Sequence, residues 1–98
     1  MSLIASLRRC ALKILIVDDS RFLCMTNERA LVKVGHQVIT ASDGEEGLRL
    51  AIEHKPDLVV LDMLLPRLSG PEVLRAMRKD AATSSIPVMV LTSLPARQ

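Results

Sequence analysis

Short apolar runs alternate along this chain with segments whose apolar residues recur at helical spacing, and this alternation restricts the possible fold more than any other feature. Four runs of aliphatic and β-branched residues have the length and character of buried strands. Along the chain a helix lies between each pair of consecutive strands, and this order of elements predicts a parallel sheet with right-handed crossovers and helices on both faces. The predicted strands are Lys13–Asp18, Gln37–Ala41, Leu58–Asp62 and Val88–Thr92.

The three segments between these strands are predicted to be helices. Ser20 can cap the first, which Gly35 ends, and the turn at Ser42, Asp43 and Gly44 can cap the second, which Pro56 breaks. Pro66 to Gly70 is a loop, and Pro71 suits the first turn of the third helix. The expected apolar faces consist of Leu23, Ala30, Leu31 and Val34, then Gly47, Leu48, Ala51 and Ile52, then Val73, Leu74 and Met77.

Length and composition indicate one small globular domain. The chain has 98 residues, of which 49% are hydrophobic and 24% charged. A net charge of +2 with scattered basic residues argues against nucleic acid as a partner, and no apolar run approaches the roughly 20 residues of a membrane span. We expect a cytoplasmic protein, with residues 1–12 as a leader or expression-derived segment and 13–98 as the domain. Cys10 and Cys24 are expected to be free thiols.

Polar side chains collect where the predicted strands end. Asp18 and Asp19 follow the first strand, Asp62 ends the third, and Thr92 and Ser93 end the fourth. Because parallel strands end at the same edge of a sheet, the three acids should converge. Two carboxylates about 4 Å apart repel by roughly 4 kcal/mol at an effective dielectric near 20. Bound Mg²⁺ (or Mn²⁺) would remove that repulsion. Asp43 and Asp57 are instead expected to cap helices or to face solvent.

Three segments, KILIVDDS, VVLDMLLPRLSG and IPVMVLTS, resemble the receiver domain of two-component response regulators, and the resemblance extends from residue 13 to about 95. It implies a flavodoxin-like, doubly wound α/β sheet with strand order 2-1-3-4-5. This chain would hold strands 2-1-3-4, without the last βα unit. The resemblance also implies a phosphoacceptor that assists its own phosphorylation and is not a turnover enzyme. Its partner would be a sensor histidine kinase or a phosphotransfer protein.

The resemblance assigns roles to individual residues. Asp62 would accept the phosphoryl group, Asp19 and Asp62 would bind the metal directly, and Asp18 would bind it mainly through water. The backbone carbonyl of Leu64 would be a further metal ligand, and the N–H groups of Leu64 and Ser93 would hold phosphoryl oxygens. The Thr92 hydroxyl would turn inward to the phosphoryl group and so switch an interaction surface.

The chain departs from the family pattern in two respects. The family has a lysine at the end of a fifth strand, and no lysine follows Lys79 here. We therefore expect a truncated receiver without the fourth helix, fifth strand and fifth helix, or one that completes its sheet as a homodimer, with the fourth strand as an open edge. Leu64 and Leu94, two residues after Asp62 and Thr92, offer no hydrogen bond to a water, which predicts slow self-dephosphorylation.

Other functions remain open or are disfavoured. The main alternative is a pseudo-receiver, in which the same fold acts as an interaction or dimerisation module without phosphorylation. A phosphohydrolase with an aspartate nucleophile usually has a second acid two residues later, where this chain has Leu64. A dinucleotide-binding domain needs glycine after the first strand, and the turn here is DDSRF. We expect no effector domain or DNA-binding motif within these 98 residues, and they do not indicate the output.

Overall fold

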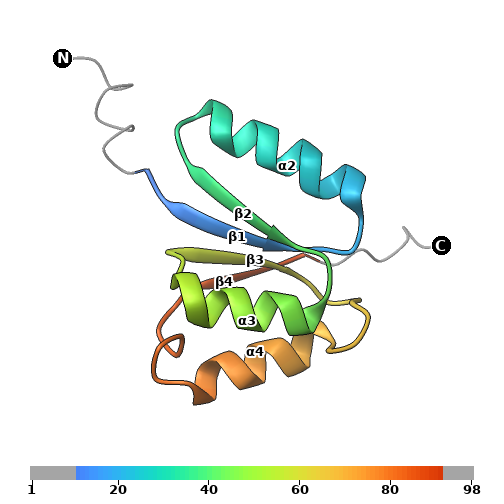
Figure 1. Cartoon of the computed structure of the whole chain (residues 1–98), viewed down its shortest axis with the longest axis vertical. Coiled ribbons are helices and arrows are strands. Elements are labelled where there is room, and N and C mark those ends of the chain that lie inside the picture. Colours follow the sequence, from blue (N-terminus) through green and yellow to red (C-terminus); the bar gives the residue numbers. More distant parts are fainter. Residues whose placement is uncertain (1–10, 92–98) are drawn as a thin grey trace.

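The computed structural model describes residues 11–91, in which four strands alternate with three helices (Figure 1). The predicted strands are confirmed: β1 ends one residue early, and the expected last residue of β4, Thr92, lies outside the described residues. In chain order the elements are β1 (Lys13–Val17), α2 (Arg21–Lys33), β2 (Gln37–Ala41), α3 (Gly44–His54), β3 (Leu58–Asp62), α4 (Gly70–Lys79) and β4 (Val88–Leu91).

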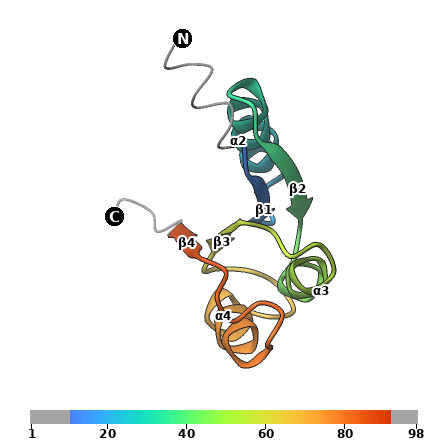
Figure 2. The same ribbon diagram turned by 90° about the vertical axis from the view of Figure 1, so that its left-hand side faces the viewer.

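All four strands run parallel, in the order β2-β1-β3-β4. Figure 2 shows the sheet nearly edge-on, with α2 on one face and α3 and α4 on the other. The expected flavodoxin-like order 2-1-3-4 is therefore confirmed. Val17 pairs with both Ala41 and Leu61, and Asp62 pairs with Leu91, so the carboxyl ends of the strands are level.

Each face of the sheet has its own apolar core, because successive strand residues point to opposite faces. Leu15, Val17 and Leu61 point toward α3 and α4, where they pack with Ala51, Val73 and Met77. Ile14, Ile16 and Val60 point toward α2, where Cys24 is the buried helix residue. The faces predicted for the second and third helices are largely confirmed, although Ile52 is exposed.

The face predicted for the first helix is wrong. Leu23 and Val34 have exposed fractions of 43% and 61%, Ala30 is also exposed, and only Leu31 packs toward the sheet. Apolar residues surround this helix, since Phe22, Met25 and Val32 are exposed as well. With apolar residues on every side, spacing alone does not select a face, and packing on β1 and β2 places Cys24 inward.

The helices α2 and α3 begin and end where the sequence predicts, and α4 begins at Gly70, the last residue of the predicted loop. Ser20 caps α2 by accepting the N–H of Leu23 at 3.3 Å, and Asp43 caps α3 by accepting that of Glu46 at 2.8 Å. Gly35 follows the end of α2 with φ +101°, a conformation that favours glycine. Asp57 is exposed but does not cap a helix. Its carboxylate accepts the N–H of Lys13 at 2.8 Å and so holds the start of β1.

Two sequence expectations concern cysteine and membrane insertion. Cys24 is buried and forms no disulfide, as expected, whereas Cys10 lies outside the described residues. Among the helices of residues 11–91, none has the length and apolar character required to cross a bilayer.

Candidate functional site

Three carboxylates meet at the carboxyl edge of the sheet. Asp18 directly follows β1, Asp62 is the last residue of β3, and these two strands are neighbours in the sheet. One oxygen from each of Asp18, Asp19 and Asp62 lies within 4.8 Å of the other two. Asp18 and Asp62 are buried, with exposed fractions of 3% and 4%, whereas Asp19 is exposed. The convergence predicted from the strand order is therefore present.

Backbone hydrogen bonds hold the two buried acids. Oδ1 of Asp18 accepts the N–H of Ser20 at 2.9 Å, and the N–H of Asp18 donates to the carbonyl of Ala41 at 3.0 Å. Oδ1 of Asp62 accepts the N–H of Leu64 at 3.2 Å. The β1–α2 turn therefore orients one carboxylate, and the loop after β3 orients the other.

The surroundings of Asp18 raise the pKa of its carboxyl. Burial raises the pKa of this carboxyl above its usual value, and the negative charges of Asp62 and Asp19 raise it further. The hydrogen bond from the Ser20 N–H acts in the opposite direction but is outweighed. A cluster of this kind favours any positive species that neutralises it, either a proton or a cation.

The donor set suits a hard divalent cation. Mg²⁺ takes oxygen ligands at about 2.1 Å, so two ligands on opposite sides of the ion lie about 4.2 Å apart. Adjacent ligands of an octahedral ion lie closer, about 3.0 Å apart, so the acidic oxygens, which lie within 4.8 Å of one another, would move closer together by side-chain rotation. Asp18, Asp19 and Asp62 could therefore hold Mg²⁺, with water completing the coordination. Zinc sites usually include nitrogen or sulfur ligands, whereas the members of this cluster of described residues are all carboxylates.

Replacing Asp18 with Asn is expected to stabilise the metal-free protein by roughly 1–2 kcal/mol at pH 7. Because the pKa of Asp18 is raised in the folded state, its ionisation opposes folding, and the penalty is complete above the folded-state pKa. Below the ordinary pKa of 3.8 both states are protonated, and the advantage of the variant disappears. Urea unfolding with a chelator at pH 7 and near pH 3.5 measures the difference.

The exposed Asp19 provides the control for that prediction, because Asp19→Asn should raise the free energy of unfolding by less than Asp18→Asn does. An equal free-energy difference between wild type and Asp18→Asn at both pH values would show that ionisation of Asp18 does not oppose folding.

Two contacts around the acids had no signal in the sequence. The thiol of Cys24 donates to the backbone carbonyl of Asp18 at 3.3 Å, and burial raises the pKa of this thiol, which keeps it protonated as a donor. Gly70 donates its N–H to the carbonyl of Met63 at 3.2 Å, and a Cβ at Gly70 would lie 2.6 Å from the carbonyl oxygen of Asp62. Gly70, the first residue of α4, is thus in close contact with the backbone of the site.

Of the remaining predicted site residues, Leu64 alone lies within residues 11–91. The Leu64 N–H, expected to hold a phosphoryl oxygen, donates to Asp62 in this structure, and the Leu64 side chain is 60% exposed. The metal-ligand role of the Leu64 carbonyl stays a prediction. Thr92, Ser93 and Leu94 lie outside the described residues, so their roles also stay predictions.

Among curated proteins, the chain is similar to protein PilH of Pseudomonas aeruginosa, with 44% identity over 81 residues. This match covers 83% of the chain and 67% of PilH. Other relatives with 40–44% identity are longer, and the chain spans only 31–34% of their length. The chain therefore corresponds to about a third of several proteins that it matches.

Solved structures that are similar to this chain point to the same family as the sequence relatives do. The N-terminal domain of a response regulator receiver protein from Methanoculleus marisnigri JR1 has 39% identity and a TM-score of 0.81, over 86% of this chain and 68% of that one. The CheX-CheY-BeF3-Mg²⁺ complex of Borrelia burgdorferi matches with 29% identity and a TM-score of 0.77, over 84% of this chain and 62% of that one. The family model of the response regulator receiver domain matches residues 14–97. The chain therefore belongs to the response regulator receiver domain family.

Proposed function

We propose that this domain accepts a phosphoryl group on Asp62, with Mg²⁺ held by Asp18, Asp19 and Asp62. The donor would be the phosphohistidine of a sensor kinase or phosphotransfer protein. The observation that carries the proposal is the meeting of three carboxylates within 4.8 Å at the strand ends, two of them buried. Membership of the receiver family supports it, as does the similar Borrelia CheY, whose structure is a complex with BeF3 and Mg²⁺.

In this proposal Asp62 is the nucleophile. Its carboxylate oxygen would form the new P–O bond while the P–N bond to the histidine breaks, which gives an aspartyl phosphate and returns the bonding electrons to the imidazole. Mg²⁺, when bound, supplies positive charge that offsets the repulsion between the anionic nucleophile and the anionic phosphoryl group. The Leu64 N–H, now on Oδ1 of Asp62, could turn to a phosphoryl oxygen.

The switching step would involve Thr92. Leu91 is the residue that pairs with Asp62 across β3 and β4, and Thr92 is the next residue in the chain. Its hydroxyl would move to hydrogen-bond the phosphoryl group, and the Ser93 N–H would hold another oxygen. This movement would bias an interaction surface between two states. Receiver domains are signalling domains, and we propose that this one transmits its state to a partner and does not turn over a substrate.

Intact mass spectrometry tests the proposal. Incubation of the chain with Mg²⁺ and acetyl phosphate should add one phosphoryl-sized increment, which a chelator prevents and which fragmentation assigns to Asp62. A chain that stays unmodified under conditions that phosphorylate a known receiver would support the pseudo-receiver alternative, in which the fold serves only as an interaction or dimerisation module.

Leu64 is expected to lengthen the lifetime of the aspartyl phosphate. Its side chain is exposed beside the acceptor and has no group that could orient an attacking water. Leu64→Asn should shorten the lifetime about ten-fold, a smaller acceleration than the roughly 100-fold or more that a fully positioned general base provides. The decay of the phosphorylated mass after removal of the donor measures this lifetime. Leu64→Met, which keeps the apolar character, is the control, and equal decay in the Asn and Met variants would contradict the prediction.

A further inference from the structure

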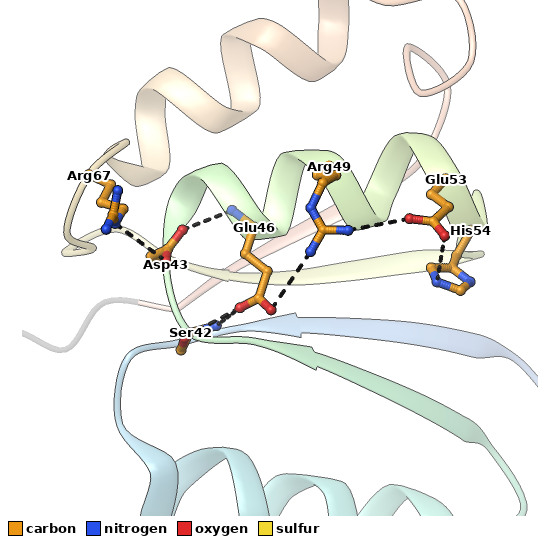
Figure 3. A network of polar contacts seen from close by, with 7 residues as sticks. All are labelled: Ser42, Asp43, Glu46, Arg49, Glu53, His54 and Arg67. Carbon is orange, nitrogen blue, oxygen red and sulfur yellow. Dashed lines mark hydrogen bonds and ion pairs between the residues drawn. The ribbon is translucent and has the colours of Figure 1, made fainter.

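The loop between β3 and α4 is attached to the start of α3 by Arg67 (Figure 3). Nη1 of Arg67 lies 3.4 Å from Oε1 of Glu45, and its Nε lies 3.8 Å from Oδ2 of Asp43. Asp43 is at the same time the N-cap of α3, through the N–H of Glu46. A single side chain of the loop therefore contacts both the cap and the first turn of the helix.

The backbone at Arg67 shows that its position is specific. Its φ is +70°, in the left-handed region that residues with a Cβ rarely adopt. Such a conformation persists where surrounding contacts impose it. Here the flanking residues also contact α3: Pro66 accepts the N–H of Gly44 at 3.4 Å, and a Cβ at Gly44 would lie only 1.7 Å from the carbonyl oxygen of Leu68. The loop is thus seated on the start of α3 by backbone contact and by the Arg67 ion pairs.

The other end of the loop is fixed beside the acceptor. The N–H of Met63 donates to the carbonyl of Leu91 at 3.2 Å, and the Met63 carbonyl accepts the N–H of Gly70 at 3.2 Å. Leu64 and Leu65 lie between this anchor and the one at Arg67. The position of the Leu64 N–H, which donates to Asp62, therefore depends on both anchors.

We infer that Arg67 is a positioning residue for the acceptor site: by pairing with Asp43 and Glu45 it holds the loop that places the Leu64 backbone against Asp62. This inference rests on the proposed function for its consequence, although the attachment itself can be measured separately. Without Arg67, the loop would keep its backbone contacts with α3 but lose the side-chain attachment, and Leu64 would become more mobile beside Asp62.

If Arg67 acted only as a surface charge, its removal would change Mg²⁺ binding in the opposite direction from loss of the attachment. Removing a positive charge from the neighbourhood of an acidic cluster should strengthen cation binding or, after screening by salt, leave it unchanged. Loss of the attachment should weaken it, because Leu64 and the Asp62 carboxylate would be less well ordered. The sign of the change therefore separates a positioning residue from a surface charge.

The experiment compares Arg67→Gln, which removes the charge and keeps a side chain with a Cβ at φ +70°, with Arg67→Lys, which keeps the charge. Arg75→Gln is the matched control, because Arg75 is an exposed arginine of α4 outside this attachment. Mg²⁺ affinity is measured by direct titration, and the mobility of Leu64 by the ¹⁵N order parameter of its amide. Urea unfolding of each variant shows whether the fold is retained.

Arg67→Gln should weaken Mg²⁺ binding about two- to five-fold, the range for loss of an exposed ion-pair cluster, and should lower the Leu64 order parameter. Arg67→Lys should restore part of both values, and Arg75→Gln should change neither. Equal values in Arg67→Gln and Arg75→Gln would overturn the inference. If wild type binds no Mg²⁺, the proposed function fails, and an unchanged Leu64 order parameter in Arg67→Gln would then overturn the attachment independently.

Discussion

Asp62→Asn is expected to abolish phosphoryl gain and, in the same molecule, to raise the stability of the metal-free fold by roughly 1–2 kcal/mol. The amide has no anionic oxygen to attack phosphorus, whereas its carbonyl can still accept the Leu64 N–H that now bonds Oδ1 of Asp62. The stabilisation follows because Asp62 contributes to the raised pKa of the buried Asp18, so removing its charge relieves a repulsion. Intact mass and urea unfolding with a chelator measure the two effects.

Addition of Mg²⁺ should make the wild-type protein more stable than Asp62→Asn. A cation that binds only the folded state stabilises it in proportion to the logarithm of its concentration above the dissociation constant, and this gain should be smaller without the Asp62 carboxylate. Asp57→Asn is a suitable control, because Asp57 is exposed at the opposite end of the strands and holds Lys13. Retention of the phosphoryl gain in Asp62→Asn would assign the acceptor to another residue.

Stability and chemistry therefore oppose each other at this site. The acids proposed to bind a cation, with Asp62 among them as the proposed nucleophile, are also the groups whose mutual repulsion costs folding energy when no cation is bound. Asp18 shows this most clearly, since it is almost fully buried and its pKa is raised by both burial and its acidic neighbours. A fold with Asn at these positions would be more stable but could not perform the proposed reaction.

The acidic cluster could be predicted from the sequence because topology alone brings its members together. Asp18 and Asp62 end two apolar runs, and once both runs are parallel neighbours in one sheet, their ends must lie at the same edge. No knowledge of side-chain packing is required for that step. The alternation of strands with helices predicted a parallel sheet with helices on both faces, whereas the order β2-β1-β3-β4 was implied by the resemblance to receiver domains.

The contacts that refine the site could not be predicted in this way. Arg67 and Glu45 are 22 residues apart and lie in exposed segments, where charged residues are common and spacing carries no signal. The inward position of Cys24 was also missed, because apolar residues occur on every side of α2. The inward position of Cys24 depends on the rotation of α2 about its axis, and the Arg67 contacts depend on how the loop packs against α3. Both are determined by three-dimensional packing after the sheet is in place.

Gly44→Ala is expected to destabilise the protein by about 3 kcal/mol or more, although alanine is the better helix former. Gly44 is the first residue of α3, and a Cβ there would lie 1.7 Å from the carbonyl oxygen of Leu68 and 2.6 Å from its carbonyl carbon. These are backbone atoms of the loop after β3, so no side-chain rotation can relieve the clash. Either α3 or the loop must move, and the Arg67 attachment would be displaced with it.

Gly35→Ala provides the control that separates a clash from backbone strain. Gly35 has φ +101° but no atom within 4 Å of an added Cβ, so this substitution should cost only about 1 kcal/mol. Urea unfolding of both variants gives the comparison, and Mg²⁺ titration of Gly44→Ala should show weaker binding, because the displaced loop carries Leu64. If Gly44→Ala were as stable as wild type, helix propensity would outweigh the contact. The loop would then not be seated on α3 in solution, and the basis for assigning a positioning role to Arg67 would be removed with it.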